Sequence, residues 1–154
     1  MKIVIVGCGR TGARLARRLS AAGDEVAVVD EKREAFIGLG PNFAGRTYQG
    51  SGLDAEVLRQ AGVESADAVL AVAGGDNRNL MIAQMVKYQF GIARVVARLR
   101  DPVRAYHYRE LGIETLCTTT VIEGLLELWV KDGVFPELPG TVSVGGDRSV
   151  LDEY

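Results

Sequence analysis

A glycine-rich segment near the N-terminus constrains the fold of this chain more than any other feature. Residues 2–6, KIVIV, are apolar and mostly β-branched, which is typical of a buried strand in a parallel sheet. They lead directly into residues 7–12, GCGRTG, a G-x-G-x-x-G sequence followed by apolar side chains at helical spacing. A strand, this loop and a helix in that order predict a phosphate-binding βα unit: Gly9 lets a diphosphate approach the backbone, and the helix N-terminus offers unpaired N–H groups.

The rest of the chain alternates between strand-like and helix-like periods. This alternation predicts a doubly wound α/β fold, a six-stranded parallel Rossmann sheet of order 3-2-1-4-5-6 with a C-terminal crossover helix. We expect one domain over residues 1–132, with a linker or stub at 133–154. The predicted strands are 2–6, 25–30, 46–49, 66–73, 94–99 and 114–117, and the predicted helices are 11–22, 31–39, 53–61, 76–90, 102–111 and 120–132.

An acidic residue closes the second predicted strand. Asp30 lies 18 residues after Gly12, close to the spacing of the acid that binds adenosine ribose hydroxyls in dinucleotide-binding domains. A helix-capping role is the alternative. A carboxylate here disfavours the 2′-phosphate of NADP, although Lys32 and Arg33 soften that argument. The pattern predicts binding of an adenine nucleotide.

The nucleotide is expected between the first and fourth strands, where the strand order reverses. The loop after the fourth strand is Ala73-Gly74-Gly75-Asp76, whose glycines would let a ligand lie against the backbone. A plain strand-to-helix turn is an equally good interpretation of those glycines. We interpret Asp76 as the N-cap of the next helix.

Composition excludes several classes of function. The net charge of −2 leaves no basic excess for a nucleic acid, and no apolar run reaches the length of a membrane span or signal peptide, so we expect a cytoplasmic protein. Two cysteines and one histidine fit no metal-site spacing. His107 is expected on a helix away from the strand ends, and Cys8 is interpreted as a small filler rather than a redox sensor. We predict no catalytic and no metal-binding residue, and a site that binds rather than reacts.

The last predicted helix, 120–132, is apolar on nearly every side, including Leu125 and Trp129. One stripe of such a helix packs on its own sheet, and the remainder also needs a cover. We predict that this helix forms a homodimer, within a larger ring. The alternative is a helix covered by the tail residues.

The motifs together resemble RCK domains, also called KTN or TrkA N-terminal domains, the cytoplasmic gating modules of potassium channels and transporters. The similarity covers residues 2 to about 132. Its motifs are GCGRTG at 7–12, YQGSGLDAEVL at 48–58, AGVESADAV at 61–69, DNRNL at 76–80, RVVAR at 94–98 and DP at 101–102.

The resemblance implies a nucleotide-sensing regulatory subunit that binds NAD(H) or ATP/ADP and gates a membrane potassium transporter or channel through a change in ring conformation. It implies a homodimer, an octameric ring and a position at the inner face of the membrane through the partner. Arg10 would contact phosphates, Asp30 the ribose, and Lys32 the adenine, while Arg98 would close the far end. The cofactor-binding residues expected are Gly7, Cys8, Gly9, Arg10, Thr11, Gly12, Asp30, Glu31, Lys32, Gly50, Ser51, Gly52, Leu53, Ala73, Gly74, Gly75 and Arg98.

The chain departs from the family pattern in three places. Ser51 replaces an Asp, which weakens the expected adenine contact. The run Thr118-Thr119-Thr120 replaces an acidic residue that begins the crossover helix in some members. The C-terminal regulatory lobe that follows in most members is not part of this sequence, which we interpret as either a truncated chain or a single-lobe subunit. The alternative interpretation is the cofactor domain of an NAD-dependent oxidoreductase whose catalytic part is on another chain.

Overall fold

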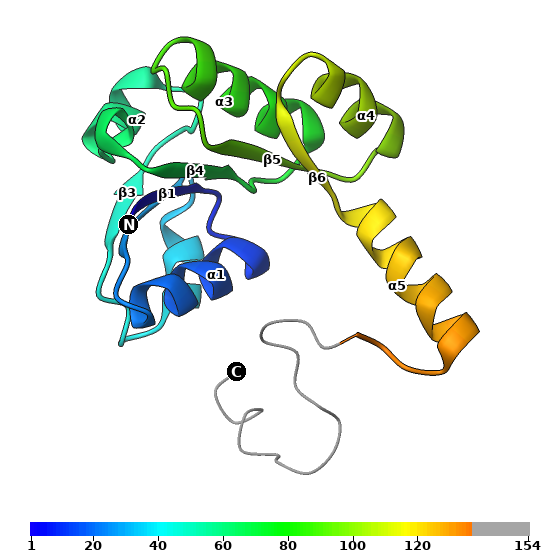
Figure 1. Ribbon diagram of the computed structural model, residues 1–154. Coiled ribbons are helices and arrows are strands. Elements are labelled where there is room, and N and C mark those ends of the chain that lie inside the picture. The colour runs from blue at the N-terminus through cyan, green and yellow to red at the C-terminus, as the bar shows by residue number, and fades with distance from the viewer. Residues whose placement is uncertain (137–154) are drawn as a thin grey trace. The chain divides into compact units, whose positions relative to one another are not determined.

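Six parallel strands form the centre of the molecule, in the order β3-β2-β1-β4-β5-β6. The computed structural model describes residues 1–136 (Figure 1). This order confirms the predicted doubly wound sheet, in which the connections of β1 run to one side and those of β4 to the other. The strands are β1 (Lys2–Val6), β2 (Glu25–Asp30), β3 (Arg46–Gln49), β4 (Ala68–Ala71), β5 (Val95–Leu99) and β6 (Glu114–Cys117).

Burial along the strands follows their place in the sheet. In β1, the central strand, Ile3 to Val6 are all buried, because both faces are covered and both neighbours are paired. β3 and β6 are the edges, and they carry exposed or alternating side chains. The apolar run at 2–6 therefore marks the centre of the sheet, as expected for a strand with two buried faces.

Helices cover the two faces unequally. On one face α1 (Arg10–Ala21) and the 3-10 helix η1 (Arg33–Leu39) pack on Ile3, Ile5 and Val28. On the other face lie α2 (Ala55–Gln60), the 3-10 helix η2 (Val63–Ser65), α3 (Asp76–Tyr88) and α4 (Pro102–Glu110), which Figure 1 shows on the opposite side of the sheet from α1. The buried side chains that these elements contribute include Leu58, Val63, Ile82, Val86 and Ala105.

Four predicted helices are shorter than expected: α3 and α4 end two residues and one residue early, and the segments 31–39 and 53–61 begin late. The segment 31–39 is a 3-10 helix that begins only at Arg33, because Asp30 accepts the Lys32 amide and holds the chain in a turn. The segment 53–61 becomes α2, whose N-cap is Asp54 and which gives way to Gly62 in the left-handed region, with φ of 83°. What remains is a 3-10 helix over Arg33–Leu39 and a short α-helix over Ala55–Gln60.

The prediction that Asp76 caps α3 is wrong. Gly75 is the N-cap, and Asp76 is the first helical residue. The Asp76 carboxylate instead accepts the backbone amides of Arg100 and Asp101, each at 3.0 Å, and so fastens the loop after β5 to the start of α3. Burial opposes ionisation of Asp76, but these amides and the Arg100 charge outweigh it and lower its pKa.

Residues from Thr120 onward form a separate compact unit, of which the structure describes 120–136. Most of the described part of this unit belongs to α5 (Thr118–Asp132), and no residue of this helix is buried. Val121, Ile122, Leu126, Leu128, Trp129 and Val130 are 43–76% exposed. Trp129 stacks on Phe135 with ring centroids 6.3 Å apart. The predicted dimer helix is thus apolar and, among residues 120–136, largely exposed apart from the stacking of Trp129 on Phe135. The tail expected as the alternative cover is residues 133–154, of which 137–154 lie outside the described residues.

Candidate functional site

The glycine-rich loop joins β1 to α1 at the carboxyl end of the sheet. Gly7 has φ of 110°, and its amide donates to Val29 O at 2.8 Å. Gly9 is the N-cap of α1, without a side-chain cap. The first amides of α1 therefore face the crevice between β1 and β4, as predicted for an anion-binding loop.

The three loop glycines have separate roles that the space around each one reveals. A Cβ at Gly12 would lie 1.9 Å from Gly7 O, and a Cβ at Gly7 would lie 2.5 Å from the Ala73 amide nitrogen. These two glycines permit close packing of backbone on backbone. A Cβ at Gly9 would meet nothing within 4 Å, and the same holds at Gly74 across the crevice. Bare backbone facing open space on both sides fits the approach of a diphosphate.

Asp30 fastens the loop from the neighbouring strand. Its Oδ2 accepts the Cys8 amide at 2.7 Å, and its Oδ1 accepts the Lys32 amide at 2.9 Å. The loop is therefore held in its bent form by a charged acceptor before any ligand arrives. Each carboxylate oxygen keeps one further acceptor position for a ribose hydroxyl.

These elements surround a cleft of about 640 Å³, within the range usual for small-molecule sites. Twelve of the predicted cofactor residues line it: Gly7, Gly9, Arg10, Thr11, Asp30, Glu31, Lys32, Gly50, Gly52, Ala73, Gly74 and Arg98. The sequence analysis missed other lining residues, namely Val6, Val29, Ala35, Val72, Arg78 and Ile82. The apolar ones are strand and helix residues whose core pattern gives no sign that they also border a cleft.

Five predicted cofactor residues do not line the cleft. Gly12 packs against Gly7, and Gly75 caps α3. Ser51 turns its Oγ inward to accept the Leu53 amide at 3.2 Å, and Leu53 itself is exposed outside the cleft. These residues shape the loops that border the cleft, while their neighbours face it.

Cys8 is the fifth of these residues, and its side chain lies in the protein interior. Its Sγ is 3.3 Å from Ala35 O, and only 3% of the residue is exposed. Burial, together with the Asp30 charge, raises the pKa of the thiol to about 11. A thiol so far from ionisation is a weak nucleophile, which favours the interpretation of Cys8 as a filler.

Arg98 and the loop after β4 are held together by one carbonyl. Ala73 O accepts both Arg98 Nη2 and Asn79 Nδ2, each at 3.0 Å, and Asn79 Nδ2 also donates to Arg98 O at 2.8 Å. Arg98 Nε and Asn79 Oδ1 are buried without a hydrogen-bond partner among residues 1–136.

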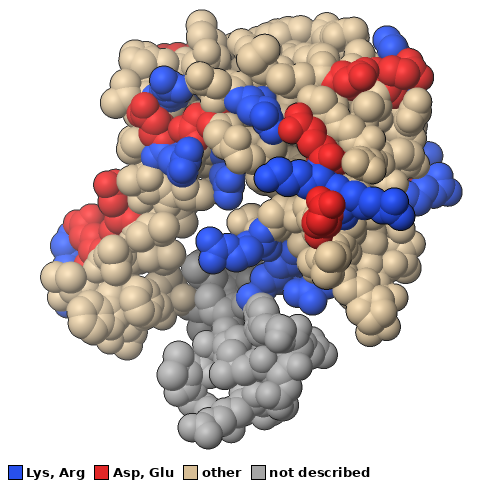
Figure 2. Space-filling view, turned by 180° about the vertical axis from the view of Figure 1, so that it is seen from behind, with Lys and Arg blue, Asp and Glu red and all other residues tan. Residues whose placement is uncertain are grey.

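An ion pair joins two side chains that line the cleft. Arg78 Nη1, from the first turn of α3, lies 3.1 Å from Glu31 Oε2 beyond the end of β2. Arg10, Lys32, Arg78 and Arg98 line the cleft against Asp30 and Glu31, which leaves an excess of two positive charges (4 − 2). Figure 2 shows Lys and Arg side chains gathered across the middle of one face, with Asp and Glu between them. The overall charge of −2 thus conceals a locally cationic cleft suited to phosphates.

Other reactive side chains lie apart from this cleft. His107 is on α4, with its ring edge-on to Tyr106, and it does not line the cleft. Within residues 1–136, no three His, Cys, Asp or Glu side chains are grouped as metal ligands. No helix in this part of the chain has the length and apolarity to cross a membrane.

The sheet order, the glycine-rich loop and the acid after β2 define a Rossmann-type domain of the dinucleotide-binding class. The TrkA-N domain family model matches residues 3–119, and the chain belongs to that family. It is 47% identical, over 118 residues, to the Trk system potassium uptake protein TrkA of Streptomyces coelicolor, an alignment that covers 77% of this chain and 53% of that protein. The chain thus spans about half the length of this relative.

Solved structures share the fold at lower identity. The AMP-bound C-terminal domain of Kef from Shewanella denitrificans superposes with a TM-score of 0.68 at 22% identity, covering 87% of this chain and 83% of that one. The GsuK channel bound to NAD superposes with a TM-score of 0.65 at 23% identity, covering 81% of this chain and 22% of that one. The resemblance to RCK domains is thereby confirmed at the level of family and fold.

Proposed function

We propose that this chain is a nucleotide-sensing regulatory domain of a potassium transport system, which binds an adenine nucleotide in the cleft at Gly9 and Asp30. The observation that carries the proposal is the open backbone at Gly9 and Gly74, which face each other across a crevice with a net positive lining. Homology to the TrkA family supplies the transport context.

The cleft supports distinct contacts for each part of the nucleotide. The α1 amides and Arg10 would hold phosphates, and Asp30 would accept the ribose hydroxyls. Gly50 and Gly52 would border the adenine, opposite Lys32. At Gly52 a Cβ would lie 2.2 Å from Val6 Cγ1, so the absence of a side chain brings this loop close to the cleft floor.

Different residues that line the cleft bear on which adenine nucleotide it would bind, NAD(H), ATP or ADP. Two carboxylates, Asp30 and Glu31, sit where a 2′-phosphate would lie, so NADP is disfavoured. Arg98, whose Nη2 donates to Ala73 O in the loop after β4, would contact the second half of a dinucleotide. Neighbouring structures hold NAD or AMP, which supports an adenine nucleotide without selecting one.

Calorimetric titration of the full chain with NADH, NAD, ATP, ADP and AMP tests the proposal. At least one of these ligands should bind with a 1:1 stoichiometry, and its binding should be lost in the Asp30→Ala variant. Binding of none refutes the function. Binding of NAD(H) alone, joined by hydride transfer in the presence of a partner chain, would favour the oxidoreductase interpretation instead.

Assembly is part of the same proposal. The exposed apolar side chains of α5 would associate with a second copy of the chain. The domain would act at the inner face of the membrane, through a transporter or channel subunit. Burying three or four large side chains of each copy contributes about 5–10 kcal/mol per copy, from which the cost of association is subtracted.

A further inference from the structure

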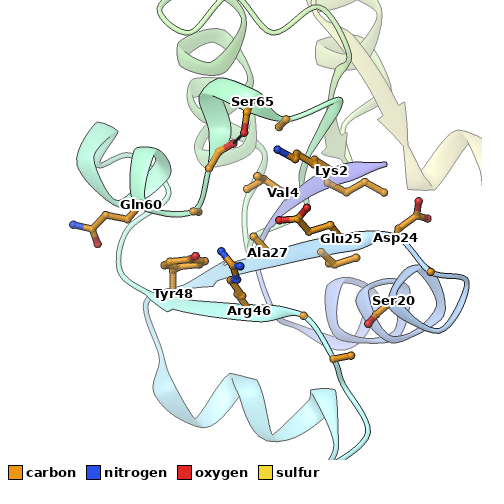
Figure 3. A pocket seen from close by; sticks show the side chains of 18 residues that line it. Lys2, Val4, Ser20, Asp24, Glu25, Ala27, Arg46, Tyr48, Gln60 and Ser65 are labelled. Carbon is orange, nitrogen blue, oxygen red and sulfur yellow. Dashed lines mark hydrogen bonds between the residues drawn. The ribbon is translucent and has the colours of Figure 1, made fainter.

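A second cavity, of about 650 Å³, lies at the amino ends of β1, β2 and β3. The glycine-rich loop is at the carboxyl ends of the strands, so the two sites are at opposite ends of the sheet. Figure 3 shows this cavity between the strand ends, the α2–η2 turn and the turn that follows α1. None of its lining residues lines the nucleotide cleft.

The register of the strands and the shortness of α2 create the cavity. Lys2 pairs with Glu25, and Ala27 pairs with Arg46, so their side chains share one face of the sheet with Val4 and Tyr48. Leu58 and Val63 cover the apolar part of that face, where Val4 and Val29 lie. The six residues of α2 and the turn at Gly62 leave the amino ends of the strands uncovered.

Three charged side chains converge on this space from three adjacent strands. Figure 3 shows Lys2 and Arg46 reaching toward it from β1 and β3, with Glu25 of β2 between them. Within residues 1–136 none of these three side chains forms a hydrogen bond or an ion pair. The nearby acids are already engaged: Asp24 pairs with the Met1 amine at 2.8 Å, and Asp67 accepts the Lys2 amide at 2.7 Å.

The spacing suits one bridging anion. Two strands that flank a third are about 10 Å apart, and Arg46 lies about 6–7 Å further along the sheet than Lys2, because their pairing partners on β2 are two residues apart. Their Cα atoms are therefore about 12 Å apart, and their long side chains can both reach a group above β2. Glu25 can only accept hydrogen bonds when ionised, so a ligand here must bring donors as well as negative charge. The floor of Val4, Ala27 and the half-buried Tyr48 offers apolar contact to a carbon skeleton.

We propose that this cavity binds a small hydroxylated organic anion. The oxyanion, a phosphate monoester or a carboxylate, lies between Lys2 and Arg46, and the ligand's hydroxyl groups donate to Glu25. Because the cavity and the cleft share no residue, the anion and the nucleotide bind at the same time. The site gives the domain a second small-molecule input, independent of the nucleotide.

Titration of the full chain with glycerol 3-phosphate, malate, inorganic phosphate and glycerol tests this assignment, with binding followed by calorimetry and by the amide NMR shifts of Lys2, Glu25 and Arg46. One or both of the hydroxylated anions should bind, shift these amides and leave Gly7 and Gly9 unmoved. The stronger of the two identifies the oxyanion. Inorganic phosphate should bind at least about tenfold more weakly, because it faces Glu25 with few donors.

Matched variants separate this site from general charge attraction. Lys2→Gln with Arg46→Gln should weaken binding about tenfold or more, since both charge-assisted contacts are lost. Arg59→Gln, which removes a cation that pairs with Glu56 and Glu64 outside the cavity, should leave it unchanged. Glu25→Gln should reduce the difference in binding affinity between glycerol 3-phosphate and inorganic phosphate. The proposal would be overturned if Arg59→Gln weakens anion binding as much as the double variant does, if neither hydroxylated anion binds, or if the amide NMR shifts are confined to the glycine-rich loop.

Discussion

Replacing Asp30 with alanine removes a carboxylate that accepts two backbone amides in the structure and that would also accept the ribose hydroxyls of a nucleotide. In the free protein the carboxylate holds the Cys8 amide at 2.7 Å and the Lys32 amide at 2.9 Å. Hydrogen bonds to a charged group are worth about 1.5–3 kcal/mol each. Because Asp30 is only partly buried and water replaces part of what is lost, we expect Asp30→Ala to lower the free energy of unfolding by about 2–3 kcal/mol in total.

The same substitution strips the ribose of its charged acceptor. A loss of about 1–3 kcal/mol in binding corresponds to roughly a 5- to 150-fold rise in Kd. Urea unfolding measures the first effect, and calorimetric titration with the tightest adenine nucleotide measures the second. Both should appear together, because one carboxylate serves the loop and the ligand.

A matched control separates the two roles. Asp67 accepts the Lys2 amide at 2.7 Å at the opposite end of the sheet, so Asp67→Ala also removes a carboxylate from a backbone amide. It should lower stability by about 1 kcal/mol and leave nucleotide affinity unchanged. If a folded Asp30→Ala binds the nucleotide as tightly as the wild type, or if Asp67→Ala weakens binding equally, Asp30 is not the ribose acceptor.

Three further predictions follow from the geometry. Gly9→Ala should leave the urea midpoint unchanged and weaken nucleotide binding at least tenfold, whereas Gly12→Ala, which forces a Cβ onto the Gly7 backbone, should lower the free energy of unfolding by about 3 kcal/mol or more. An equal loss of stability in the two variants would contradict these roles. Alkylation of Cys8 by iodoacetamide should be negligible at pH 8 and rise only as the pH approaches about 11, and rapid labelling of the native protein at pH 8 would show that the thiol is not buried. Because the pKa of Cys8 is raised in the folded state, the stability that the protonated thiol contributes is full below about pH 8.5 and is lost as the pH rises from there to about 11. Leu125→Asp with Trp129→Asp should convert a dimer to a monomer in sedimentation velocity, and a monomeric wild type would refute the interface.

The sequence predicted the sheet order and the position of the cleft because both follow from local signals. The apolar run at 2–6 and the glycine spacing at 7–12 are short-range features, and the right-handed rule for parallel connections then leaves few topologies. The place of Asp30 at the cleft was predicted from its position at the end of the second strand and its distance from Gly12. These inferences need no knowledge of side-chain contacts between distant segments.

Contacts between distant segments explain what the sequence analysis missed. Asp76 looks like a helix cap from its neighbours, yet its carboxylate is taken by amides 24 and 25 residues further along. Arg78 lines the cleft because it pairs with Glu31 across 47 residues, which no local pattern records. Ser51 turns away from the cleft because Leu53 offers it a closer partner.

The geometry also limits where the nucleotide can influence the rest of a transport assembly. A ligand shifts a conformational equilibrium only by the difference between its affinities for the two states. The Gly7–Gly9 turn is held by hydrogen bonds to Asp30 and Val29, so we expect the part of the cleft proposed for the diphosphate and ribose to change little between states. The groups free to differ are the exposed Arg10 and the Glu31–Arg78 pair, in which both partners are 44% exposed. If two nucleotides shift the conformational equilibrium differently, we expect the difference to arise where their terminal phosphates or adenine contact these side chains. Substitution of Arg10 or Arg78 should therefore change the response to a nucleotide more than it changes the stability of the fold.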